Sequence, residues 1–132
     1  MVETKIKVRF EDIDALGHLN NTKYFTYLEE GRIALFEKIR GKFSLSKIDF
    51  VVKYLEGNFI EPIYPGCEVT VKVEIEKIGN TSITLKETIW YNNKLCFEGK
   101  CVLVFYDFKK GTKKNIPEDV LYNIKEETKK ES

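Results

Sequence analysis

Hydrophobic and polar positions alternate most strictly between residues 69 and 76, where the sequence reads VTVKVEIE. A period of two places the apolar side chains on one face and the polar ones on the other, as in a half-buried β-strand. Residues 5–10, KIKVRF, predict a first strand with Ile6, Val8 and Phe10 on its inner side. Further segments rich in Val, Ile, Tyr and Phe predict strands over residues 50–60, 81–91 and 95–106.

Short turn sequences separate the last three strands. Gly79-Asn80 and Asn92-Asn93 are typical of tight antiparallel turns, because Gly and Asn tolerate positive φ. Between the second and third strands, EPIYPG at residues 61–66 interrupts the pattern, since proline cannot donate to a strand ladder. The last three strands are therefore predicted to form a meander.

A helical period begins at Asn20 or Asn21, either of which is a suitable N-cap. At about 100° per residue, one face gathers Tyr24, Leu28, Gly31, Leu35 and Ile39. A glycine disfavours a helix by roughly 1 kcal/mol relative to alanine, so Gly31 predicts a close contact between this helix and its neighbour. The broad apolar face indicates a central helix that a sheet wraps around.

One strand, one long helix and four further strands form an α+β arrangement with the helix against one face of the sheet. Pro117, Glu118 and Asp119 open a short C-terminal helix, since proline is favoured at the first helical position. A chain of 132 residues can bury a substantial core but is too short for two ordinary domains. We expect a single domain over residues 1–132.

The charges nearly balance, with 22 Lys and Arg residues against 21 Asp and Glu residues. Bulk charge therefore gives no reason to expect a nucleic acid or an anionic membrane surface as partner. The N-terminal sequence has no apolar run long enough for a signal peptide or a membrane span. We expect a cytoplasmic protein that binds neither nucleic acid nor membrane.

Three cysteines, Cys67, Cys96 and Cys101, accompany a single histidine, His18, and none has the spacing of metal ligands. We expect no metal site. The cysteines are most simply small buried side chains, and a reactive thiol is the alternative.

The most informative stretch lies between the first strand and the helix. Its pattern F-x-D-x-D-x-x-G-H-x-N-N-x-x-Y-x-x-Y-x-E, over residues 10–29, resembles the hotdog-fold acyl-CoA thioesterases of the 4-hydroxybenzoyl-CoA thioesterase type. The resemblance implies a hotdog fold, in which a five-stranded antiparallel sheet wraps around one long central helix. It also implies hydrolysis of an acyl-CoA or acyl-ACP thioester to free acid and thiol, without a cofactor, by a homodimer or homotetramer.

The matching positions imply a catalytic site. Asp14 takes the place of the family's loop carboxylate, which attacks the thioester carbonyl or activates water. His18 would orient a water molecule or donate a hydrogen bond to the carbonyl. The N–H groups of residues 21–24 would form an oxyanion hole at the helix start. The substrate-binding residues would be Gly17, Asn20, Asn21, Tyr24 and Glu29.

Each of these residues also has a structural interpretation. Asp14 can hold an Asx-turn, and His18 can tie down the loop. The two asparagines can act as helix caps alone, and Tyr24 can be a core residue. Glu29 can pair with Arg32, three positions on. Glu11 and Asp12 are expected to shape the loop.

Two other hotdog functions remain as alternatives. R-specific enoyl hydratases carry D-x-N-P-x-H, with histidine five positions after aspartate, whereas here His18 follows Asp14 by four and no proline intervenes. A non-catalytic acyl-CoA sensor would need an attached effector domain. Plant acyl-ACP thioesterases carry D-x-N-x-H, and Leu16 replaces their asparagine.

Candidate ligands for the phosphates of CoA are Arg40, Lys53 and the basic residues of 109–114.

Overall fold

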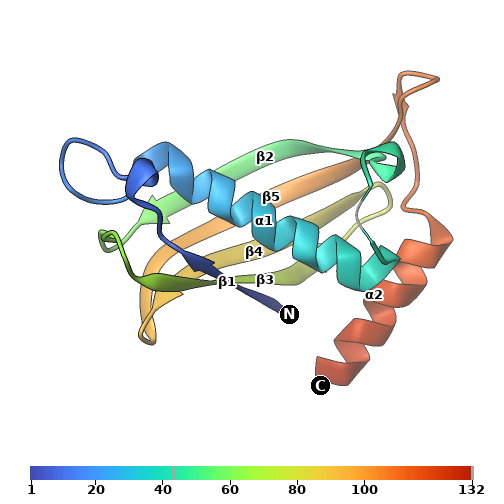
Figure 1. Cartoon of the computed structure of the whole chain (residues 1–132). Coiled ribbons are helices and arrows are strands. Elements are labelled where there is room, and N and C mark those ends of the chain that lie inside the picture. The colour runs from blue at the N-terminus through green and yellow to red at the C-terminus, as the bar shows by residue number, and fades with distance from the viewer. Residues whose placement is uncertain (43, 132) are drawn as a thin grey trace.

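In the computed structural model, which describes residues 1–42 and 44–131, a curved antiparallel sheet wraps around one long helix (Figure 1). This helix, α1 (Asn21–Arg40), runs across the sheet, and α2 (Glu118–Glu131) lies beside the C-terminal end of α1. The strands are β1 (Val2–Lys7), β2 (Phe50–Phe59), β3 (Glu68–Ile78), β4 (Ser82–Tyr91), β5 (Lys94–Asp107) and β6 (Thr112–Lys113). The predicted α+β hotdog fold is confirmed.

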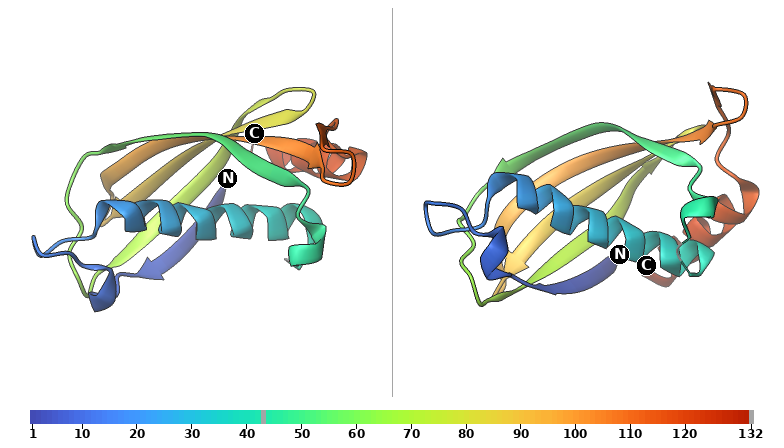
Figure 2. Two further views of the ribbon diagram at one scale, coloured as in Figure 1. Left: turned by 90° about the horizontal axis from the view of Figure 1, so that it is seen from above. Right: turned by 45° about the horizontal axis from the view of Figure 1, so that its top comes forward.

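The five long strands follow the order β1-β3-β4-β5-β2, and all neighbouring pairs are antiparallel. The short β6 pairs with the end of β5. β3, β4 and β5 form the predicted meander, and its second turn places Asn92 and Asn93 at φ 47° and 61°, the left-handed region that such turns require. β1 and β2 are thus the two edges of the sheet, which curls around α1 (Figure 2).

Gly31 sets how closely α1 approaches the sheet. A Cβ atom at this position would lie 2.8 Å from side-chain carbons of both Val71 and Val73 on β3. The predicted close contact is confirmed, because a larger residue here would have to displace the helix or both valines. The predicted inner face of α1 is also buried, at Tyr24, Leu28, Leu35 and Ile39.

The first strand lies closer to the N-terminus than predicted. β1 ends at Lys7, and Phe10 begins a 3-10 turn with its side chain 85% exposed. The prediction that Phe10 faces inward is wrong, because the chain leaves the sheet after Val8, whose N–H donates to the carbonyl of Cys67 (2.9 Å). The carbonyls of Arg9 and Phe10 then accept hydrogen bonds from residues three positions on, which turns the chain towards α1.

A buried ion pair joins α1 to the middle of the sheet. Nη1 of Arg32 donates to both carboxylate oxygens of Glu87 on β4, each at 2.8 Å. The predicted pairing of Arg32 with Glu29 is therefore wrong: a fully buried carboxylate needs an ionic partner, and Arg32 follows Gly31 where α1 lies close to the sheet. Burial raises the pKa of the Glu87 carboxyl, and the Arg32 guanidinium acts against that rise.

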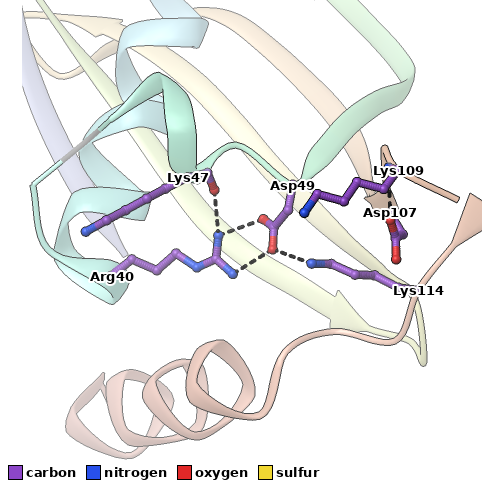
Figure 3. A network of polar contacts seen from close by, with 6 residues as sticks. All are labelled: Arg40, Lys47, Asp49, Asp107, Lys109 and Lys114. Carbon is purple, nitrogen blue, oxygen red and sulfur yellow. Dashed lines mark hydrogen bonds and ion pairs between the residues drawn. The ribbon is translucent and has the colours of Figure 1, made fainter. Parts of the chain in front are cut away.

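A polar cluster fastens the C-terminal end of α1 (Figure 3). Asp49, just before β2, accepts hydrogen bonds from Nη1 and Nη2 of Arg40 (2.6 and 3.0 Å) and pairs with Lys114 (2.8 Å). Burial favours the neutral carboxyl, but these two cations outweigh it and hold the pKa of Asp49 below its ordinary value. Nearby, Val120 and Ile124 of α2 are fully buried.

Candidate functional site

The motif residues form a tight loop between β1 and α1. Ile13 and Leu19 form an antiparallel bridge at its base. Inside it, the N–H of Asp14 donates to the carbonyl of His18 (3.1 Å), and the N–H of Gly17 donates to the carbonyl of Asp14 (3.1 Å). Gly17 has φ +85°, a conformation that other residues adopt only with strain. The backbones of Asp14 and His18 thus lie opposite each other on the two sides of the loop.

The carboxylate of Asp14 is half-buried, and one of its oxygens accepts the N–H of Leu16 (2.9 Å). This contact is the Asx-turn that the sequence offered as a structural alternative. The second carboxylate oxygen has no hydrogen-bond partner within residues 1–42 and 44–131. The Asx-turn therefore orients the side chain and leaves one oxygen available for a ligand or a water molecule.

Two backbone contacts hold the loop in place. The N–H of Leu19, a fully buried residue, donates to the carbonyl of Ile63 (2.6 Å) in the connection between β2 and β3. The N–H of Asn20 donates to the carbonyl of Asp12 (3.0 Å). The position of Asp14 is thus set by the sheet as well as by the helix.

Asp12 anchors the loop from below, in keeping with its predicted part in shaping it. Its carboxylate is buried and accepts hydrogen bonds from the Tyr27 hydroxyl (2.7 Å) and Nε of Arg9 (3.1 Å). Burial alone would raise the pKa of the Asp12 carboxyl, but these two hydrogen bonds outweigh it and hold that pKa below its ordinary value. Asp12 is therefore a structural carboxylate.

Of the two candidate caps, Asn20 is the N-cap of α1. Its Oδ1 accepts the N–H and the hydroxyl of Thr22 (both 2.9 Å), and its carbonyl accepts the N–H of Lys23 (2.8 Å). The N–H of Asn21, by contrast, has no partner among the residues that the structure describes. The helix start therefore offers one free backbone donor, at the positive end of the helix dipole.

The remaining predicted residues are spread along α1 and the loop. His18 is half-buried, its Nδ1 lies 3.4 Å from the carbonyl of Leu19, and its ring makes no hydrogen bond or ion pair with the Asp14 side chain among the described residues. Tyr24 is buried, which raises the pKa of its hydroxyl to about 12, and Cys96 and the Asp14 carboxylate act in the same direction. Tyr24 is thus a core residue in the first turn of α1. Glu29 is exposed and lies further along α1, in a different environment.

That environment is a groove of about 330 Å³ between α1 and β2. Its walls are mainly apolar and consist of Glu29, Arg32, Ile33, Phe36, Leu45, Ile48, Phe50 and Val52. Nearer the start of α1 lies a cluster of four aromatic rings, Tyr24, Phe25, Phe59 and Phe97. No sequence pattern indicates this cluster, because its members come from α1, β2 and β5.

Glu87 is a further buried residue that the sequence analysis does not single out, although the sequence pattern marks its position. It stands between Leu85 and Ile89 on the inward face of the strand, where a carboxylate breaks the apolar alternation. A charged residue at such a position predicts a buried ion pair or a functional carboxylate. Its partner Arg32 could not be chosen from the sequence, because 55 positions separate them.

The comparison with known proteins agrees with this geometry. Residues 8–124 match the profile of the thioesterase-like superfamily. The chain belongs to this superfamily. A predicted thioesterase of Bacillus stearothermophilus is 34% identical, with a TM-score of 0.89 and coverage of 94% of this chain and 93% of that chain.

Two further relatives widen the comparison. A thioesterase of Thermus thermophilus, solved with coenzyme A and zinc, is 32% identical, with a TM-score of 0.84 and coverage of 92% of this chain and 95% of that chain. The chloroplastic acyl-acyl carrier protein thioesterase ATL2 of Arabidopsis thaliana is 29% identical over 112 residues, which make up 81% of this chain and 60% of that protein. Superfamily and relatives support thioester hydrolysis as the general activity.

The basic residues considered for the CoA phosphates are not at the Asp14 loop of the same chain. Arg40 and Lys114 both bind Asp49 at the opposite end of α1 (Figure 3). A helix of 20 residues is about 30 Å long. Lys53 lies at an irregularity of the edge strand β2, between Val52 and Tyr54. Arg40 and Lys114 therefore lie at the end of α1 opposite this loop.

The described residues contain neither a metal-ligand cluster nor a membrane-spanning helix. No group of three or more His, Cys, Asp or Glu side chains there could hold a metal ion. Cys96 and Cys101 are buried, Cys67 is half-buried, and all three are free thiols. Within the same residues, no helix is long and apolar enough to span a membrane.

Proposed function

We propose that this chain hydrolyses an acyl thioester of coenzyme A or acyl carrier protein to a free acid and a thiol. The observation that carries the proposal is that one anchored loop holds both a free carboxylate oxygen on Asp14 and, at the start of α1, a free N–H on Asn21, each without a partner among the described residues. The first can provide the attacking group and the second can stabilise the oxyanion, and neither requires a cofactor.

In the proposed reaction, Asp14 attacks the thioester carbonyl or removes a proton from the attacking water. The carbonyl oxygen becomes an oxyanion, which the N–H of Asn21 and the dipole of α1 stabilise. The C–S bond then breaks, and the thiolate leaves and takes up a proton. If water attacks, the acyl group is released directly as the acid; if Asp14 attacks, a mixed anhydride forms, and a water molecule hydrolyses it to the acid and restores the Asp14 carboxylate. His18, on the other side of the loop from Asp14, would hold the water or the carbonyl by a hydrogen bond.

A panel of acyl-CoA and acyl-ACP thioesters, followed with a free-thiol reagent, tests this function directly. We expect stoichiometric release of thiol and acid from at least one class, since Asp14 offers a free carboxylate oxygen and Asn21 offers a free N–H. Thioester that binds but is never cleaved would contradict the proposal and favour a non-catalytic acyl-CoA-binding protein.

The exposed edge of the sheet supports a homodimer, or a tetramer built from dimers. Among the described strands, β2 pairs with β5 alone, so its outer backbone groups are unpaired. Several of its apolar side chains are exposed, namely Val51, Val52, Tyr54, Leu55 and Phe59. A long apolar edge strand in a stable protein is usually covered. We propose that β2 of a second chain covers it and completes the walls of the site.

Light scattering should therefore give at least twice the 15.4 kDa mass of one chain at micromolar concentration. Tyr54→Lys should shift the mass towards the monomer, because it places a charge on the proposed interface and Tyr54 does not line the groove. Tyr122→Lys, on the exposed side of α2, serves as the matched control and should leave the mass unchanged. A monomeric wild-type protein would contradict both the dimer and a site shared between chains.

A further inference from the structure

The seam between α1 and β2, which we define by the inward-facing residues of β2, is apolar and only partly covered. Val52, Leu55 and Phe59 pair with Leu103, Cys101 and Phe97, all fully buried. Directly paired residues in an antiparallel sheet share a face, so these side chains of β2 also point to the helix side. They are nevertheless 37–48% exposed. Within one chain, the helix thus leaves an apolar seam uncovered along this strand, which the proposed second chain would cover in part.

At its far end, the seam widens into the groove of about 330 Å³. Phe36 and Phe50 stack there with ring centroids 4.5 Å apart. Leu45 and Ile48 line the same end. This part of the seam would hold an alkyl chain, since its walls are largely apolar.

At its near end, next to the Asp14 loop, the four-ring cluster fills the seam. The ring of Phe59 packs nearly edge to face against three other rings. The distances between ring centroids are 4.9 Å to Tyr24, 5.2 Å to Phe97 and 6.2 Å to Phe25. Phe97 also contacts Tyr24 (5.4 Å) and Phe25 (5.7 Å). Tyr24 is the fourth residue of α1 and lies within electrostatic reach of the Asp14 carboxylate. Along α1, the cluster therefore lies between the start of the helix and the groove, whose first helical wall residue is Glu29.

Two glycines fix the position of the central ring. Gly57 and Gly99 are paired across β2 and β5 on the face that Phe97 shares. A Cβ atom at Gly57 would overlap the Phe97 ring, and one at Gly99 would lie 2.9 Å from its Cε1. The ring of Phe97 thus occupies space that side chains at these two positions would otherwise fill.

We propose that this aromatic cluster limits the acyl group at the Asp14 site to a short chain or a single aromatic ring. The inference rests on the proposed thioesterase function. An acyl group whose carbonyl lies at the start of α1 meets the rings of Phe59 and Phe97 before it can reach the groove. Short chains end before the rings, and a planar acyl group can pack against them edge to face.

The test is a series of straight-chain acyl-CoAs from acetyl to palmitoyl, with benzoyl-CoA, measured as kcat/KM. The wild type should favour the short chains and benzoyl over the long chains. Phe59→Ala should raise the ratio of long-chain to short-chain kcat/KM by about tenfold or more, the discrimination typical of a few methylenes in an apolar pocket. Phe59 is 46% exposed, so the variant is expected to fold. Phe25→Leu, also half-buried, provides a second opening of the same cluster.

Phe108→Ala is the matched control, because Phe108 is a similarly exposed phenylalanine (57%) packed on one aromatic ring, Tyr106, near β6. It should leave the chain-length profile unchanged. Equal wild-type activity towards short and long chains, or an unchanged profile in both cluster variants, would overturn the size limit. Binding of S-alkyl-CoA thioethers of graded length, measured by calorimetry, separates this failure from failure of the proposed function. A protein without turnover that still binds only the short thioethers supports the limit, and one that binds all lengths equally overturns it.

Discussion

Replacing Asp14 by asparagine is expected to lower kcat by at least about 100-fold, the lower range for a lost general base or nucleophile. The amide oxygen of asparagine can still accept the N–H of Leu16, which Asp14 now accepts at 2.9 Å. The turn should therefore keep its shape while the free carboxylate oxygen is lost. Steady-state release of thiol, together with a circular dichroism spectrum matching the wild type, measures the effect.

Glu11→Gln is the matched control, since Glu11 is an exposed carboxylate of the same segment, 3.8 Å from Arg9. It should change kcat less than threefold or so, because loss of an exposed ion pair has little effect. A folded Asp14→Asn protein with wild-type turnover would move the chemistry to another residue. Single turnover in heavy-oxygen water then separates the two roles of Asp14: label in its carboxylate identifies a nucleophile.

Glu87→Gln is expected to lower the free energy of unfolding by about 3–5 kcal/mol, the range for breaking one side of a buried ion pair. The guanidinium of Arg32, whose side chain is 9% exposed, would remain in the core without a countercharge. Replacing both partners, Arg32→Met with Glu87→Met, should recover most of the loss, because the double variant leaves no buried charge. Urea unfolding at one fixed protein concentration measures these differences, since assembly also contributes to stability.

Glu98→Gln on the exposed side of β5 is the control and should stay within about 0.5 kcal/mol of the wild type. A loss equally small for Glu87→Gln would mean that the pair is solvated in solution. A double variant less stable than Glu87→Gln would mean that Arg32 and Glu87 stabilise the folded state by more than neutralising each other's charge.

The parts of the fold that depend on local pattern could be predicted from the sequence. The alternation of residues 69–76, the turn at Asn92-Asn93 and the apolar face around Gly31 each encode their structure within a few residues. Phe10 shows the limit of this approach. The alternation extends to it, but hydrogen bonds between Val8 and residues near Cys67 end the strand earlier. No local pattern contains a contact made about 60 positions away.

The candidate site divides in the same way. Asp14, Gly17 and Asn20 lie in one continuous motif, so their roles in the loop and cap could be stated from sequence, while their catalytic roles stay predictions. The pairing of Arg32 with Glu87, and the approach of Phe59 to Phe97, depend on strand register across the sheet. That register is set by the whole core, and a single sequence does not reveal which inward residues meet.

The strand order determines when each strand can find its partner while the chain is being synthesised. The two edge strands are made first: β1 must wait for β3 (Glu68–Ile78), and β2 must wait for β5 (Lys94–Asp107). The central three strands are joined by short turns and carry little loop-closure entropy, whereas pairing of either edge closes a long loop. On the ribosome, α1 and β2 therefore emerge well before the surface that buries them. A chain released before residue 94 contains no strand that can pair with β2 as it does in the complete sheet.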